Sequence, residues 1–323
     1  MSCQERIYGL DVVRSAAIFL VVLQHSWTML DLGQAAGTIQ HHFYSSIIYG
    51  VALFVMISGA LNLRNVQPAL QFYKKRYARI LPPFLLWGTV TYVISSLTGR
   101  YDCVNDLSSG VRMYLPYLLT GKINDAYWFV YLIAAIYLIT PLLQRLFCRD
   151  SRTSKTALPV AIVIWFALES FTTIPGRAGI LVLYVGYYLC GAFFLKYVSH
   201  RNRRLTLAAG SLCFVGFFLY NVHLHSAGQA SFIVECGEIL SMFAVLSETN
   251  PHTRLFERIS RYSYFIYLTH FIIIRSLYTF CPGVFPPVWY TPILTTILVI
   301  GLESVVCLFL DRMGNVPKRI AGI

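Results

Sequence analysis

The sequence predicts an all-α protein, a polytopic membrane bundle of about ten transmembrane helices with both termini in the cytoplasm. Of its 323 residues, 57% are hydrophobic and only 12% are charged, whereas an ordinary soluble domain carries about 25% charged residues. The mean hydropathy is +0.61, and apolar segments recur along the whole chain. These properties exclude a soluble globular enzyme, because too little polar surface is available to cover one.

Ten apolar segments are about as long as a helix that crosses the hydrocarbon core, roughly 20 residues. They run over residues 10–30, 44–63, 81–98, 127–147, 158–174, 179–197, 205–222, 230–247, 262–279 and 291–311. The second contains Ser58 and Gly59, small residues that suit close helix packing. The longest connection, 98–126, is predicted to form a lid or a partly re-entrant element on the outer side. We therefore expect a single transmembrane domain over 1–323.

The basic residues support this arrangement. Nineteen of the 26 Lys and Arg residues fall in alternate connections on one side of the membrane, and four fall on the other. Because cytoplasmic loops are rich in Lys and Arg, the sequence predicts that both termini are cytoplasmic. The net charge of +12 then reflects topology, and no nucleic acid is expected as a partner. The eight Cys residues show no spacing typical of a metal site, so no metal is expected.

The first span contains three ionisable residues, Asp11, Arg14 and His25. At about 100° per residue they share one stripe of the helix, and His25 lies about 16 Å beyond Arg14 along the axis. Ionisable residues at membrane depth are costly and mark functional sites. His25 is predicted to be a general base or nucleophile reached from both sides; the alternative is a histidine that bonds to a backbone carbonyl in a packed bundle. Asp11 and Arg14 are interpreted as a structural ion pair.

The eighth span places Glu235 below its outer edge, at about the depth of His25. A carboxylate at this depth would orient the imidazole and stabilise its charged form, as the third member of a catalytic triad does. Glu235 is therefore a candidate catalytic residue. The alternative is a glutamate that only faces an outer vestibule.

A basic cluster of Lys75, Arg76 and Arg79 precedes the third span. An amphipathic helix in this segment places the three side chains near one another, and forked guanidinium groups suit phosphate. The alternative is a cluster that only sets the topology and touches anionic lipid.

Two pairs of residues are candidates for the substrate cavity. Tyr267 and His270 share one face of the ninth span, where they either line the cavity of His25 or bond to a neighbouring helix. Trp128 and Tyr131 open the fourth span at the outer interface. Aromatic belts are common there, but a sugar ring also stacks on such side chains.

Five segments follow one another in an order that resembles a known family. They are Gly-Leu-Asp-Val-Val-Arg at 9–14 with Gln24-His25-Ser26 downstream, Phe-Val-Met-Ile-Ser-Gly at 54–59, Lys-Arg-Tyr-Ala-Arg-Ile-Leu-Pro at 75–82, Trp-Phe-Val-Tyr-Leu-Ile-Ala-Ala-Ile-Tyr-Leu-Ile-Thr-Pro-Leu-Leu at 128–143 and Ile-Ser-Arg-Tyr-Ser-Tyr-Phe-Ile-Tyr-Leu-Thr-His at 259–270. Together they resemble acyltransferase family 3 over most of the chain.

The resemblance implies a ten-span enzyme of the bacterial cytoplasmic membrane. Members use cytoplasmic acyl-CoA, usually acetyl-CoA, to acylate glycans assembled or displayed across the membrane. His25 then matches the essential first-span histidine, and Arg76 and Arg79 match the arginine pair on the CoA side. Asp11 and Arg14 are implied to belong to the active core. The chain resembles the short type that lacks an extra periplasmic hydrolase-like domain.

The predicted function is transfer of an acyl group, in the first instance acetyl, from acyl-CoA to a hydroxyl of a glycan or lipid-linked sugar. The basic cluster and Arg14 would hold the nucleotide phosphates while the acyl arm enters a tunnel that leads to His25. His25 would act as a base or as a transient acyl carrier. The alternative is a transporter or flippase for a small acid or a lipid-linked sugar, which makes no covalent bond.

Overall fold

The protein is described from a computed structural model that places residues 7–30, 49–97, 107–148, 152–172, 174–199, 201–226, 231–249 and 253–314. Throughout these ranges every regular element is helical and none is a strand. The predicted all-α class is confirmed for this part of the chain.

The helices follow the predicted spans. They are α1 (Tyr8–Met29), α3 (Gly50–Asn62), α4 (Ala69–Leu97), α5 (Leu107–Thr120), the 3₁₀ turn η2 (Asp125–Tyr127), α6 (Trp128–Phe147), α7 (Arg152–Phe171), α8 (Gly176–Phe193), the π-helical turn η3 (Phe194–Val198), α9 (Arg203–Ser226), α10 (Phe232–Glu248), α11 (Arg254–Phe280) and α12 (Thr291–Arg312). Each of the ten predicted spans overlaps one of these helices.

Several helices suit a protein that crosses the membrane more than once. Within the described ranges, six stretches are long and apolar enough to span a bilayer: α1, α4, η2 with α6, α8 with η3, α9 and α12. A seventh helix, α3, is apolar but has only 13 residues. The chain therefore fits a multi-pass membrane protein. The full count of ten spans and the cytoplasmic location of both termini remain predictions.

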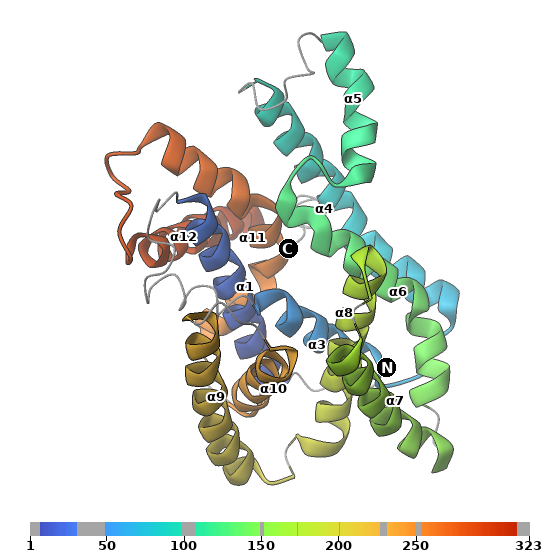
Figure 1. The fold of residues 1–323 in the computed structure, drawn as a ribbon. Coiled ribbons are helices and arrows are strands. Elements are labelled where there is room, and N and C mark those ends of the chain that lie inside the picture. Colours follow the sequence, from blue (N-terminus) through green and yellow to red (C-terminus); the bar gives the residue numbers. More distant parts are fainter. Residues whose placement is uncertain are drawn as a thin grey trace.

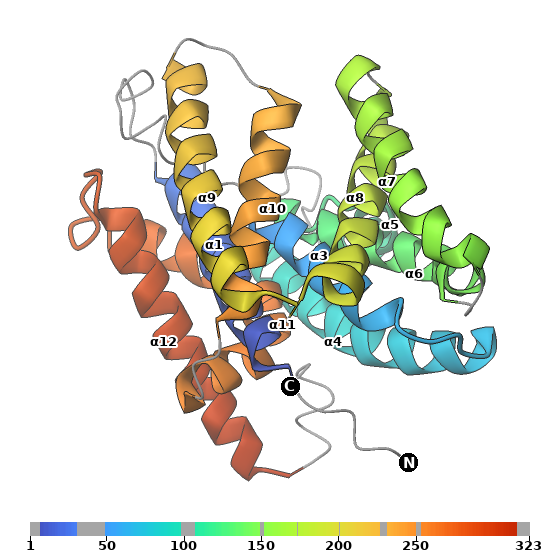
Figure 2. The same ribbon diagram turned by 90° about the horizontal axis from the view of Figure 1, so that it is seen from below.

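Helix α3 lies at the centre of the bundle (Figures 1 and 2). On one side of it stand α1, α9, α10 and α12, and on the other side stand α4, α6, α7 and α8. Helix α11 packs against α1, α12 and α4, so it joins the two groups. The side chains of α1 and α3 supply much of the buried core, for example Val13, Ile18 and Leu53, which are fully enclosed.

The backbones of α3 and α8 touch at two glycines. A Cβ atom at Gly59 would collide with the carbonyl oxygen of Tyr188, and one at Gly191 would collide with the carbonyl oxygen of Met56. Small residues permit this close approach of membrane helices. Gly59 therefore occupies a tight helix contact, whereas its neighbour Ser58 lines a cavity.

Helix α11 runs parallel to α1 and is tied to it near both ends. Near the beginning of α11 the hydroxyl of Ser260 donates to Oδ1 of Asp11 at 2.6 Å. Near its end the hydroxyl of Tyr278 donates to the carbonyl oxygen of Ser26 at 3.1 Å. These two bonds fix the register of the helices, and this register places the middle of α11 beside the last turns of α1.

The predicted outer connection contains a helix of its own. Residues 98–106 lie outside the described ranges, and α5 and η2 occupy part of the remainder. The hydroxyl of Tyr92 on α4 donates to the carbonyl oxygen of Gly110 on α5 at 2.7 Å, and Figure 1 shows α5 beside the end of α4, projecting from the rest of the bundle. The element η2 turns back and leads into α6.

Candidate active site

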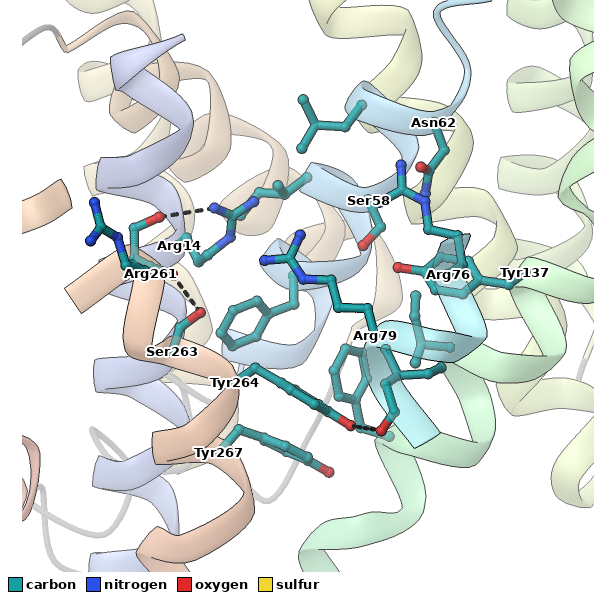
Figure 3. Close-up of a pocket in the computed structure, with 17 residues that line it drawn as sticks. Arg14, Ser58, Asn62, Arg76, Arg79, Tyr137, Arg261, Ser263, Tyr264 and Tyr267 are labelled. Atoms are coloured by element: carbon teal, nitrogen blue, oxygen red, sulfur yellow. Dashed lines mark hydrogen bonds between the residues drawn. The ribbon is translucent and has the colours of Figure 1, made fainter. Parts of the chain in front are cut away.

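Three guanidinium groups face one cavity between α1, α3, α4, α6 and α11. Arg14, Arg76 and Arg79 line it, and its volume is about 160 Å³. In Figure 3 the three side chains extend into the same space from α1 and α4. Arg261 also borders the cavity, but its guanidinium group is turned away from the other three (Figure 3) and lies 3.9 Å from Oδ2 of Asp311. We call this space the guanidinium cavity.

Arg14 is held in place by two polar neighbours. Its Nη1 donates to the hydroxyl of Ser260 at 2.9 Å, and the same hydroxyl donates to Asp11. The Asp11 carboxylate also lies 3.7 Å from Nη1 of Arg14 and is buried. The i,i+3 pair that the sequence predicts is therefore formed, and Ser260 connects its two members to α11.

The other two arginines have few polar partners. The guanidinium carbon of Arg76 lies 5.7 Å from the ring centroid of Phe72 and 5.9 Å from that of Tyr137, a cation–π arrangement. Its Nε is buried and forms no hydrogen bond with any residue in the described ranges. Arg79 makes no hydrogen bond or ion pair with any residue that the structure describes. Three positive groups and one carboxylate leave a net positive cavity, which is suited to an anion.

Lys75 does not join this cavity. Its side chain is exposed on α4, and it is not part of the lining. Around the helix, residue 75 is about 100° from residue 76 but only about 40° from residue 79, so helical spacing alone does not separate Lys75 from the two arginines. Of the basic cluster, only the two arginines face the cavity.

His25, in the last turns of α1, lies beside His270, which is nearer the middle of α11. The ring centroids are 5.2 Å apart, and the ring of Phe271 is 5.6 Å from that of His25. The His25 side chain forms no hydrogen bond with the described residues. Its role as a general base or nucleophile stays a prediction.

His270 is completely buried. Its Nδ1 lies 3.0 Å from the carbonyl oxygen of Ile266, which assigns the ring hydrogen to Nδ1. The other nitrogen, Nε2, is buried without a hydrogen bond to any described residue. His270 contacts His25, but its hydrogen bond is made within its own helix and not to a neighbouring one, and whether it lines a substrate cavity stays a prediction.

Two side chains stand between the guanidinium cavity and His25. Tyr267 lines the cavity, and its ring centroid is 6.0 Å from that of His270. The lining of the cavity ends at Tyr267 on α11 and does not include His25. The expected tunnel is therefore not open along this route: the rings of Tyr267 and His270 fill the way to His25.

The short element η2 is attached to α11 beside the histidines. The carbonyl oxygen of Ala126 accepts a hydrogen bond from the hydroxyl of Tyr267, and the hydroxyl of Tyr127 donates to the carbonyl oxygen of Leu268 at 3.0 Å. The side chain of Asn124 caps η2 by accepting from the backbone N–H of Ala126 at 2.9 Å. These contacts position the first residue of η2, Asp125.

Asp125 is the carboxylate that acts electrostatically on the His25 ring. Sequence reasoning placed it only in the outer connection. The sequence feature that could have identified Asp125 is its position, three residues before Trp128, where the chain enters the fourth predicted span. It was missed because no helical spacing relates Asp125 to His25.

Glu235 lies elsewhere. Its electrostatic neighbours are Tyr49, Tyr184, Tyr187 and Glu238, and no interaction joins it to His25 among the described residues. The predicted pairing rested on equal depth in the membrane. Depth does not determine the direction in which a helix presents a side chain, and α10 presents Glu235 toward α8.

Trp128 and Tyr131 also lie away from the histidines. The ring of Trp128 is 5.6 Å from that of Tyr184 on α8, and 39% of this residue is exposed. The hydroxyl of Tyr131 donates to the carbonyl oxygen of Leu118 on α5. Neither side chain lines the guanidinium cavity. No group of His, Cys, Asp and Glu side chains within the described ranges is arranged to hold a metal ion.

Comparison with known proteins identifies the family. The model of a family described as an acyltransferase domain, Acyl_transf_3, matches residues 7–309. No curated protein and no solved structure gives a match. The matched range includes every side chain of the guanidinium cavity and of the histidine pair. Because the match covers nearly the whole chain, this protein belongs to acyltransferase family 3.

Proposed function

We propose that the protein transfers an acetyl group from cytoplasmic acetyl-CoA to a hydroxyl group of a glycan or lipid-linked sugar at the outer face of a bacterial cytoplasmic membrane. The family supports acyl transfer as the reaction. The observation that carries the proposal further is the convergence of Arg14, Arg76 and Arg79 on one cavity whose wall continues through Tyr267 and His270 to His25.

The guanidinium cavity suits the nucleotide end of acyl-CoA. Phosphate groups bind well to forked guanidinium donors, and Arg76 and Arg79 carry few competing partners. The cavity lies near the first residues of α1 and α11, at the end of the bundle that the basic residues predict to be cytoplasmic. A volume of about 160 Å³ holds only part of such a molecule, so the remainder of the nucleotide stays outside and the thioester arm points inward.

The arm reaches His25 only when Tyr267 moves. Its hydroxyl is bonded to the carbonyl oxygen of Ala126, and rotation of the ring breaks this one bond and opens the way past His270. Exclusion of water until the arm enters protects the thioester from hydrolysis. Tyr267 is thus assigned to the donor path, which refines its expected role as a substrate-binding residue.

Two chemical routes use the same imidazole. In the first, a ring nitrogen of His25 accepts the hydroxyl proton while the hydroxyl oxygen bonds to the thioester carbon; the carbon–sulfur bond breaks, and the proton passes to the sulfur of CoA. In the second, one ring nitrogen bonds to the carbonyl carbon, the carbon–sulfur bond breaks, and the hydrogen of the other ring nitrogen passes to the sulfur, so that CoA leaves as the thiol. The acceptor oxygen then bonds to the acyl carbon, the carbon–nitrogen bond breaks, and the hydroxyl proton returns to the ring. Both routes need a ring nitrogen without a hydrogen bond, and the His25 ring forms none with the described residues.

The test is acyl transfer by the purified protein in lipid vesicles. Acetyl-labelled CoA and glycolipids extracted from the source membranes are supplied, and labelled glycolipid and free CoA are measured in equal amounts. His25→Ala is expected to abolish both products while the protein still inserts and folds. Movement of the glycolipid or of acetate across the vesicle membrane without labelled product would identify a transporter instead and refute the proposal.

A further inference from the structure

A second cavity lies on the other side of the histidine pair. It is formed by the outer part of α4 and the last turns of α11, and its volume is about 340 Å³. Its lining includes Ser95, Phe271, Arg275, Ser276 and Thr279, and it shares no residue with the guanidinium cavity. We call it the Arg275 cavity.

The two cavities divide α11 between them. The guanidinium cavity takes residues 260–267 of this helix, and the Arg275 cavity takes residues 271–280. His270 lies at the boundary. Tyr267, which lines the guanidinium cavity, contacts His270. Phe271, which lines the Arg275 cavity, contacts His25, with the two ring centroids 5.6 Å apart. A molecule in the Arg275 cavity therefore approaches His25 from the side opposite to the donor.

The Arg275 cavity contains polar groups that the protein does not use. Arg275 forms no ion pair or hydrogen bond with the described residues, and the hydroxyls of Ser276 and Thr279 form none either. By contrast, Thr91, Ser96, Thr269 and Thr296 bond to the carbonyl oxygen four residues earlier in their helices. Arg275 is exposed and lies five residues from the end of α11, about 7.5 Å along the axis, so its guanidinium group is accessible to a molecule that enters the cavity from this end.

We propose that the Arg275 cavity binds the acceptor and that this acceptor is a sugar attached to phosphate, as in the head group of a lipid-linked sugar. This inference rests on the proposed function and names its substrate class. The guanidinium group of Arg275 binds the phosphate with forked hydrogen bonds, and the free hydroxyls of Ser276 and Thr279 bind sugar hydroxyls. Phe271 supplies an apolar wall for one face of the sugar ring.

The size and position of the cavity support this class. A volume of about 340 Å³ accommodates a single sugar with its phosphate, near the lower limit of ordinary small-molecule sites. Arg275 lies near the predicted outer surface of the bilayer. The phosphate that joins a sugar to its membrane lipid lies at the same depth. The accepting hydroxyl then points along Phe271 toward His25.

The test measures two Michaelis constants in vesicles. Initial rates of acetyl transfer are recorded against the concentration of extracted glycolipid, dosed by its phosphate content, and separately against acetyl-CoA. Arg275→Gln is expected to raise the KM for the glycolipid about 10-fold or more, the effect of one lost charge-assisted hydrogen bond, with the KM for acetyl-CoA unchanged. The matched control is Arg177→Gln, which removes an exposed arginine from the beginning of α8 and leaves both constants unchanged.

A second experiment uses an acceptor from which the phosphate has been removed. Mild acid releases the sugar from its lipid phosphate. If Arg275 binds that phosphate, the wild-type protein has a raised KM for the released sugar, and Arg275→Gln adds no further loss. A separate loss of similar size in the variant would show that Arg275 acts on something else and would overturn the inference.

The same kinetic measurements show whether Arg275 binds the acceptor or an ordinary phospholipid. If Arg275 only contacts phospholipid head groups, the loss of rate in Arg275→Gln differs between vesicles of phosphatidylglycerol and vesicles of phosphatidylcholine. It does not depend on the concentration of the acceptor. That result, or an unchanged KM for the glycolipid, rejects the Arg275 cavity while the acyltransferase remains. If the wild-type protein forms no labelled product at all, the proposed function fails, and the acceptor role of this cavity fails with it.

Discussion

The imidazole rings of His25 and His270, one from α1 and one from α11, lie with their centroids 5.2 Å apart. The carbonyl oxygen of Ile266 holds the hydrogen of His270 on Nδ1, so the buried Nε2 carries only a lone pair. No described residue donates to this nitrogen in the structure. We predict that it accepts a hydrogen bond from the N–H of His25 when the substrates are bound, and that this bond decides which nitrogen of His25 meets the substrate.

Variants of His270 test this positioning role. His270→Phe keeps the ring but removes both nitrogens, and it is expected to lower kcat about 10- to 100-fold with little change in either KM. His270→Gln, whose amide reaches the place of Nε2, is expected to recover most of the activity, whereas the shorter His270→Asn is not. Equal activity of the Phe and Gln variants would show that only the volume of the ring matters.

The two arginines of α4 are expected to control the affinity for the donor. Arg76→Gln and Arg79→Gln each remove a charged hydrogen-bond donor from the guanidinium cavity, a loss of about 1.5–3 kcal/mol per phosphate contact. The KM for acetyl-CoA is therefore expected to rise roughly 10- to 100-fold in each variant. Binding of acetyl-CoA to the protein in detergent, measured by calorimetry, checks the prediction without turnover.

Lys75→Gln is the matched control for the arginine variants. Lys75 lies in the same helix and carries the same charge, but it does not line the cavity. Its replacement is expected to change the affinity for acetyl-CoA less than twofold. If it weakens binding as much as Arg79→Gln does, the general charge of the surface matters and the cavity does not.

Asp125 and Glu235 provide a comparison between two acidic residues. Asp125 acts electrostatically on His25, and Glu235 has other neighbours. Asp125→Asn is expected to lower kcat about 10-fold, because the positive charge that His25 gains during catalysis loses a stabilising carboxylate. Glu235→Gln is expected to leave kcat within twofold of the wild-type value. Single-turnover rates of acetyl transfer check both variants, and the reverse order would restore Glu235 as the partner of His25.

The helix contact between α3 and α8 is expected to limit stability. Gly59→Ala places a methyl group against the carbonyl oxygen of Tyr188 and forces the helices apart, at a cost of about 1–3 kcal/mol. A lower midpoint of thermal unfolding in detergent is expected. Gly216→Ala is the control, because a Cβ atom there meets no other atom within 4 Å, and its midpoint is expected to be unchanged or slightly higher.

The sequence predicted where the helices lie better than it predicted which helices pack together. Each of the ten apolar segments overlaps a helix in the described ranges, since a helix in a bilayer must satisfy its own backbone hydrogen bonds, but only six stretches are long and apolar enough to count as candidate spans. The helix α5 was not foreseen, because its segment was taken as a connection. Depth along a span also follows from the sequence, and it placed His25 correctly toward the far end of α1 from Arg14.

The direction of each side chain could not be predicted in the same way. Glu235 has a suitable depth but faces α8, and Lys75 is close in sequence to two cavity residues but does not line the cavity. Arg275 lies within the predicted span 262–279, but the sequence does not show that it borders a cavity. Which helices pack together, and with which faces, depends on contacts between segments far apart in the chain, such as the bond from Ser260 to Asp11. One sequence contains no direct record of these contacts.

Transfer from one side of a sealed membrane to the other tests the central claim most directly. The protein is inserted in vesicles, its orientation is determined, and acetyl-labelled CoA is supplied only on the side of Arg76 and Arg79 while the acceptor is confined to the opposite side. Labelled acceptor is expected to form in the intact vesicles and to be absent with His25→Ala. Two results would contradict a reaction at His25 between two compartments. One is labelled acceptor that forms only after the vesicles are opened, and the other is equal formation of labelled acceptor by His25→Ala.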